Sequence, residues 1–175
     1  MSYSEIDLFW TDMKSYLEIL DAALSPIICK IDTATGPIDE HLCDRSEYLF
    51  GAGFVAIQKY MLETRHLKKI KFTKAIDPKV PDNSQVPFEE AVWAAANYWK
   101  HDAEWWSVAF QESDQSTGKE KDIPNNILRN SEILSAFGVF GRDYLCSTVL
   151  AAYTPSKDLR LSSLLPLILD WRKSL

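Results

Sequence analysis

Apolar residues recur at intervals of three and four along the first part of the chain. This spacing places the side chains on one face of an α-helix, and it predicts a long amphipathic helix over residues 4–31. Ser4 stands where an N-cap residue is expected. Pro26 is expected to kink this helix or to end it early, because proline lacks the amide hydrogen and clashes with the preceding turn. The apolar positions are Ile6, Phe9, Met13, Tyr16, Leu20, Ala23 and Ile27.

A second helix is predicted over residues 45–72, after a segment (32–44) whose Asp, Thr, Gly and Pro content predicts a loop. Gly51 and Gly53 lower the helix propensity, but a residue without a Cβ lets another helix approach closely. We therefore expect these two glycines to form a packing notch. The expected apolar stripe of this helix runs through Tyr48, Ala52, Val55 and Leu62.

Further helices are predicted from residue 88 onward. A third, long helix covers residues 88–112, and Asn125 or Asn126 can cap a fourth that ends near residue 137. A fifth covers residues 141–153, and a last one starts near Asp158 and is interrupted at Pro166. No convincing run of alternating strands occurs in the sequence. The expected fold is all-α, a single domain over residues 1–175 built as a helical bundle of about five to six helices.

Length and charge narrow the class of protein. A chain of 175 residues can bury a core without disulfides or metal, and three widely spaced cysteines suggest neither a disulfide framework nor a zinc module. The formal net charge of −6 disfavours a surface that binds nucleic acid throughout, although a local basic patch can still bind a phosphate backbone. The N-terminus lacks the apolar core of a signal peptide, and no apolar run is long enough for a membrane span. We therefore expect a cytoplasmic protein without membrane contact or cofactor.

The tryptophan- and tyrosine-rich segment 95–106, AANYWKHDAEWW, contains His101. On a continuous helix His101 lies opposite the expected core stripe, and Asn97 and Glu104 lie about one turn before and after it, within reach of the imidazole. A histidine held by an amide and a carboxylate can act as a general acid or base. The same arrangement also suits a structural histidine. Catalytic candidates are thus His101, Asn97 and Glu104, with the structural alternative open. The expected core stripe consists of Val92, Ala96, Trp99, Ala103, Trp106 and Phe110.

The stretch ANYWKH, residues 96–101, resembles the signature region of the HEPN superfamily of small α-helical proteins. Active members carry an Arg, commonly followed by Asn or another polar residue, with about four to six residues between that Arg and a His. Asn97 and His101 match this pattern, whereas Ala96 stands at the Arg position. The resemblance implies a homodimer that pairs its motif helices. In active relatives it also implies metal-independent RNA cleavage, in which the His promotes attack by a ribose 2′-hydroxyl and the Arg stabilises the phosphate.

The alanine at the Arg position decides between the functions that the resemblance implies. Ala96 cannot stabilise a charged transition state, and losing such a contact typically costs orders of magnitude in rate. The favoured hypothesis is therefore a non-catalytic HEPN-like binding protein, of the kind found in defence, toxin–antitoxin or immunity systems. One alternative is an endoribonuclease that uses His101, with Lys100 or Arg65 supplying the cation. Another is a structural protein–protein interaction module.

Aromatic residues surround the predicted third helix on more than one side. Such a helix is either central to the bundle or covered by a partner subunit. We expect a homodimer that forms through the 93–108 face of this helix.

The second helix is predicted to end in a run of cations. They complement the helix dipole, and the alternative is a patch that binds phosphate groups. The candidates for nucleic-acid binding are Arg65, Lys68, Lys69, Lys71 and Lys100.

A separate group of possible metal ligands occurs in the expected 32–44 loop. Structural zinc usually needs a second ligand pair at defined spacing, which this segment lacks, so we expect a solvated acidic loop and no metal site. The possible ligands are Asp39, His41, Cys43 and Asp44.

Overall fold

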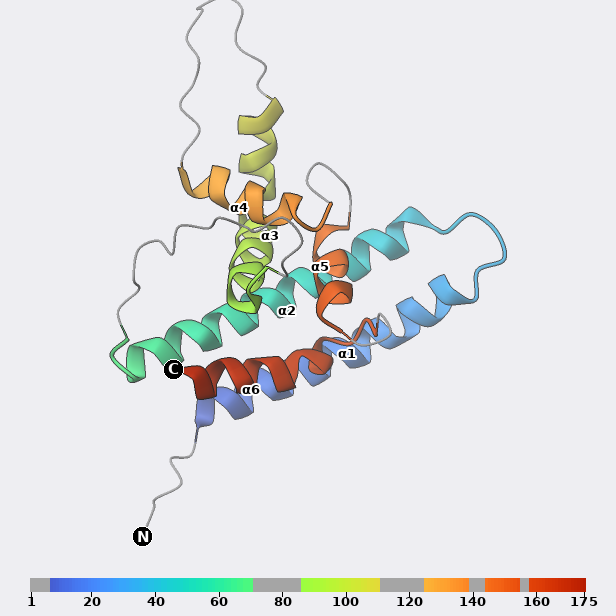
Figure 1. The fold of residues 1–175 in the computed structure, drawn as a ribbon. Coiled ribbons are helices and arrows are strands. Elements are labelled where there is room, and N and C mark those ends of the chain that lie inside the picture. The colour runs from blue at the N-terminus through green and yellow to red at the C-terminus, as the bar shows by residue number, and fades with distance from the viewer. Residues whose placement is uncertain (1–6, 71–85, 111–124, 139–143, 155–157) are drawn as a thin grey trace, which may run out of the picture.

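The protein is all-α over the residues that the computed structural model describes, which are 7–70, 86–110, 125–138, 144–154 and 158–175, without the side chains of residues 8, 102–110 and 126. This part of the chain forms six α-helices and a short 3-10 helix and contains no strand, so the predicted fold class is confirmed. Helices α1 and α2 form an antiparallel pair, and α6 lies along α1 (Figure 1). The elements are α1 (Leu8–Asp32), α2 (Glu40–Leu67), α3 (Phe88–Phe110), α4 (Asn125–Ser135), α5 (Leu145–Tyr153), η2 (Leu161–Leu164) and α6 (Leu165–Ser174).

Asp7 starts helix α1 and ties it to two other helices. Its Oδ1 accepts the backbone N–H of Trp10 at 3.0 Å, so Asp7 is the N-cap residue and the expected cap at Ser4, which lies outside the described residues, is wrong. Its Oδ2 accepts the hydroxyl of Tyr60 on α2 at 3.0 Å and lies 2.7 Å from the guanidinium of Arg172 on α6. One carboxylate therefore caps α1 and joins three helices.

Pro26 does not end helix α1, which continues to Asp32. Proline cannot donate to the carbonyl four residues earlier, which belongs to Ala22. Both Ala22 and Pro26 are exposed, so water can satisfy that carbonyl. The helix therefore tolerates the missing hydrogen bond, and the prediction of an early end was wrong.

Helix α2 begins earlier than the sequence pattern predicts. The side chains that it turns toward the core also differ from the predicted ones. Asp39 is its N-cap and accepts the backbone N–H of His41 at 3.0 Å, so residues 40–44 of the expected loop are helical. Tyr48 and Leu62 of the expected stripe are 64% and 37% exposed. The stripe prediction was wrong for these two residues, whereas Ala52 and Val55 are half-buried and pack against the core. Apolar residues surround most of α2, and the neighbouring helices decide which of them are covered. The core side chains are Phe50, Phe54, Ile57 and Met61.

The predicted packing notch on α2 is confirmed. A Cβ built on Gly51 would lie 1.8 Å from the Trp99 ring of α3, and one on Gly53 would lie 2.5 Å from Leu161 of η2. The Trp99 ring leaves no room for a side chain at Gly51, and a Cβ at Gly53 would displace the end of the Leu161 side chain. Helix α2 thus receives α3 on one side and the C-terminal segment on another.

Helices α5 and α6 begin at other residues than the sequence predicts. Tyr144 adopts the left-handed conformation with φ 65° at the N-cap of α5, so this helix cannot extend back to residue 141 as predicted. Pro166 lies in the first turn of α6 rather than interrupting a helix. Proline is well tolerated there, because the amides of a first turn have no intrahelical partner.

Two carboxylates of the long helices cap the short C-terminal ones. Glu47 on α2 accepts the backbone N–H groups of Cys146 and Ser147, the latter at 3.0 Å, at the start of α5. Asp21 on α1 accepts those of Leu161 and Ser162, at 2.7 and 3.0 Å, at the start of η2. Neither short element caps itself with a side chain. The long helices therefore supply the acceptors that the first turns need.

We predict that Gly51→Ala lowers the free energy of unfolding by about 1–3 kcal/mol, because the new methyl group forces Trp99 and α3 away from α2. Urea unfolding followed by tryptophan fluorescence measures this loss. Gly36→Ala is the matched control, since a Cβ at Gly36 has no atom within 4 Å. Equal effects of the two substitutions would contradict the close approach at Gly51.

We predict a pH-dependent difference between the wild type and Glu47→Gln. Burial raises the pKa of Glu47 above its ordinary 4.5, against the lowering effect of the Ser147 and Cys146 N–H groups. The folded state then binds the proton more tightly than the unfolded chain does. The stability from this group is present below pH 4.5 and is lost as the pH rises through the folded pKa.

The wild-type free energy of unfolding, relative to that of Glu47→Gln, should therefore fall as the pH rises above 4.5 and then level off. Urea unfolding at several pH values checks this. Glu47→Ala, which leaves two amides without their acceptor, should lose about 1–3 kcal/mol at every pH. A difference that grows with pH would contradict the raised pKa.

Candidate functional site

The candidate site lies on α3, at a break in the helix. His101 is exposed and has φ −127° and ψ 16°, values outside the helical range, so two helical segments meet at this residue. Figure 1 shows the second segment of α3 extending away from the body of the molecule. The sequence pattern assumed one continuous helix. Because the helix breaks at His101, helical spacing no longer shows that Asn97, His101 and Glu104 share a face. The side chain of Glu104 lies outside the described part of the chain.

A buried amide gathers two of the predicted site residues. Gln58 of α2, which is 3% exposed, donates from Nε2 to Asn97 Oδ1 at 3.1 Å. Its Oε1 accepts a hydrogen bond from Lys100 Nζ at 2.8 Å. Burial lowers the pKa of the Lys100 ammonium below its ordinary value. Gln58, Asn97 and Lys100, which we call the Gln58 cluster, thus fix the polar surface next to His101.

Sequence analysis did not identify Gln58 as a site residue. Its position among the apolar residues of α2 was the available signal, because a buried amide must find hydrogen-bond partners. Those partners are on α3, and helical periodicity does not show which residues of two separate helices meet.

Ala96, at the Arg position of the HEPN pattern, is fully buried. It belongs to a run of alanines on α3 that packs into the core with Val92. An arginine here would place its charge among apolar side chains, at high energetic cost. This environment explains the alanine by packing and removes the position from any surface that could hold a phosphate.

The aromatic residues in the first half of α3 are half-buried within the monomer. Trp99 lies over Gly51 and meets the ring of Tyr48 edge to face at 5.2 Å, and Tyr98 packs against the core. Helix α3 contacts α2, α4, α5 and α6. Of the two explanations open from the sequence, a central helix therefore accounts for these aromatic residues without a partner subunit.

The basic end of α2 is built into the bundle. Arg65 forms an ion pair with Glu89 of α3, and Glu89 also accepts the indole N–H of Trp171 at 3.0 Å. Lys68 donates from Nζ to the backbone oxygen of Arg172 at 3.1 Å, so the C-terminal ends of α2 and α6 lie side by side (Figure 1). Cations at two adjacent helix ends offset both dipoles.

Lys69 closes helix α2 in a left-handed conformation, with φ 55°. Its N–H donates to His66 O and that of Ile70 to Arg65 O, both at 3.0 Å, which is the Schellman pattern of a helix end. The predicted candidate Lys71 lies outside the described residues. The described cations at this end thus have structural roles, and phosphate binding by them stays a prediction.

The acidic segment expected as a solvated loop is the start of α2. Asp39 is the N-cap, and His41, Cys43 and Asp44 follow in the helix, so the loop prediction is corrected. Within the described ranges, no group of three or more His, Cys, Asp or Glu residues is placed to hold a metal ion.

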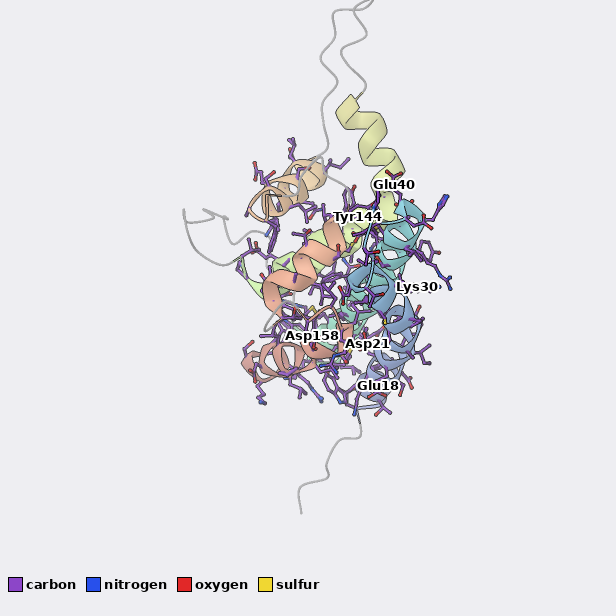
Figure 2. All side chains as sticks on the ribbon, turned by 90° about the vertical axis from the view of Figure 1, so that its right-hand side faces the viewer. Glu18, Asp21, Lys30, Glu40, Tyr144 and Asp158 are labelled. Atoms are coloured by element: carbon purple, nitrogen blue, oxygen red, sulfur yellow. The ribbon has the colours of Figure 1, made fainter. Side chains whose placement is uncertain are left out.

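A separate groove of about 350 Å³ lies between the C-terminal half of α1 and residues 158–160. Ile28 and Leu159 contribute apolar surface, and Asp21 and Asp158 lie at its edge (Figure 2). The Arg160 guanidinium beside Asp158 holds the pKa of that carboxyl below its usual value. No predicted site residue lines this groove.

Comparison with known proteins does not assign this chain to a class. No family model, no curated protein and no solved structure matches it. Among the described helices, none has the length and apolar character needed to cross a membrane.

We predict that Lys69→Gly raises the free energy of unfolding by about 1 kcal/mol, because glycine adopts the left-handed conformation without the cost of a Cβ. Lys69→Ala is the control, since it removes the charge but keeps the Cβ and should bring no gain. Thermal and urea unfolding compare the three proteins. A loss of stability in Lys69→Gly would show that the lysine side chain itself stabilises this end.

Proposed function

We propose that this chain is a non-catalytic HEPN-like binding protein that acts as a homodimer, in a defence, toxin–antitoxin or immunity context. The observation that carries the non-catalytic part is the burial of Ala96 at the position of the family's arginine. The Gln58 cluster supports a non-catalytic role, because Asn97 and Lys100 both form hydrogen bonds with Gln58 within the protein.

The bound ligand in this proposal is a protein rather than RNA. The net charge is −6, and two of the candidate cations have partners within the protein: Arg65 pairs with Glu89, and the exposed Lys100 donates to Gln58. RNA binding depends on cations that can approach phosphate groups from solvent. The surface offered to a protein partner is the polar part of α3 around Asn97, Lys100 and His101.

The second candidate function is a metal-independent endoribonuclease. It is favoured by the exposure of His101, which sits at a helix break directly after the cationic Lys100. In this alternative the imidazole takes the proton from a ribose 2′-hydroxyl and Lys100 replaces the missing arginine. The two candidate functions predict different effects of His101→Ala on RNA cleavage.

We predict that the purified protein leaves mixed RNAs intact in EDTA. His101→Ala should change no activity and should lower the free energy of unfolding by less than about 1 kcal/mol, because the side chain is exposed. Denaturing gels and end-group analysis of the RNA provide the readout. Cleavage that leaves 2′,3′-cyclic phosphate ends, and that disappears in a normally folded His101→Ala protein, would replace the binding proposal with the endoribonuclease.

A further inference from the structure

An apolar face extends along the outer side of the α1–α2 pair. Among the described residues, six of the eight large hydrophobic side chains that stay exposed lie on these two helices. Ile19 is 65% exposed, more than any other of them. The face, which we call the outer face, consists of Phe9, Tyr16 and Ile19 of α1 and Tyr48 and Leu62 of α2, with the half-buried Val55 between the last two. The sixth exposed side chain, Leu67, is the last residue of α2.

Helical geometry places the outer face away from the rest of the bundle. On α1, Asp21 contacts the C-terminal segment, and at 100° per residue Tyr16 and Ile19 project from the opposite flank. On α2, Gly53 faces Leu161, and Val55 projects from the other side. Figure 2 shows α4, α5 and α6 together on one side of α1 and α2. None of these three helices covers the outer face, and α3 reaches its edge, where Trp99 meets the ring of Tyr48.

The spacing of the outer face is that of helices which pack against other helices. Phe9 and Tyr16 are seven residues apart on α1, and Tyr48, Val55 and Leu62 are seven apart on α2. A repeat of seven keeps apolar side chains along one seam of a helix, where a nearly parallel or antiparallel helix can cover them. The seam covers residues 9–19 on α1 and residues 48–62 on α2.

The size of the face matches what a dimer needs. Helices α1 and α2 contain 25 and 28 residues. At 1.5 Å per residue and about 10 Å per helix, the whole outer side of the pair, of which the outer face is a part, amounts to roughly 750 Å². This is close to the ~800 Å² that each partner buries in an interface of standard size.

Charge also permits two copies of this acidic chain to meet here. Lys59 and Glu63, on the solvent side of α2, form an ion pair with each other, so together they add no net charge. Copies with a net charge of −6 repel one another, and the Lys59–Glu63 pair adds nothing to that repulsion where they touch.

We propose that the outer face is the homodimer interface, occupied by the same face of a second copy. The two-fold axis lies between the two copies, runs parallel to the helices and is level with the line where α1 meets α2. It places α1 of each copy against α2 of the other. Each seam of α1 then covers a seam of α2. The inference rests on the homodimer of the proposed function but moves the interface from the 93–108 face of α3. The polar surface around Asn97 and Lys100 stays open for a different partner.

Sedimentation velocity of the full chain, from one to about one hundred micromolar, tests this interface. The wild type should be a dimer, and Ile19→Glu and Leu62→Glu should each weaken it about tenfold or more by placing unpaired charges in the contact. Leu128→Glu is the matched control: it adds the same charge to an exposed leucine of α4 and should leave the dimer intact. Circular dichroism and thermal unfolding confirm that the variants fold, which the exposure of Ile19 favours.

Other outcomes separate the interface from the proposed function. If Trp105→Glu abolishes the dimer while Ile19→Glu and Leu62→Glu do not, the inference is overturned and the homodimer of the proposed function stands, with α3 as its interface. A wild type that stays monomeric over the whole range overturns both the interface and the homodimer. The RNA experiment on His101 is independent of either result.

Discussion

The architecture depends on how closely α2 can be approached at Gly51 and Gly53. Two residues apart on a helix, these glycines point to different sides, so α2 receives the indole of Trp99 on one side and Leu161 on another. A side chain at Gly51 would separate α2 from α3, and one at Gly53 would displace the end of the Leu161 side chain. The remaining contacts of α3, including the one between Gln58 and Asn97, are possible only at the distance that the glycines allow.

Polar contacts then fix where the short helices start, which apolar packing alone does not determine. Asp7, Asp21 and Glu47 each accept backbone amides at a helix start, and each lies on one of the two long helices or directly before it. A helix as short as α5 gains little from its own propensity, so its position depends on its anchors. The long pair thus determines both the direction and the starting residue of the short elements.

The sequence predicts the elements of this fold better than their contacts. Periodicity was sufficient for the number of helices, and the absence of a Cβ was sufficient for the notch at Gly51. It failed for the exposed face of α2, because that helix is apolar on most sides and its neighbours decide what is covered. It also missed the break at His101, since residues 88–110 contain neither proline nor glycine, the usual signals of a kink. The Gln58 cluster depends on which turns of two distant helices meet, which only the folded structure specifies.

The carboxylate caps also have a consequence for how the chain folds. Helices α1 and α2 are neighbours in sequence and pair locally, whereas Glu47 is 99 residues from Cys146 and Asp21 is 140 residues from Leu161. Local contacts form fast and distant ones late. During synthesis on the ribosome, the α1–α2 hairpin is complete long before its capped elements exist. The amides that start α5 and η2 can therefore reach their acceptors only after the whole C-terminal third has been synthesised.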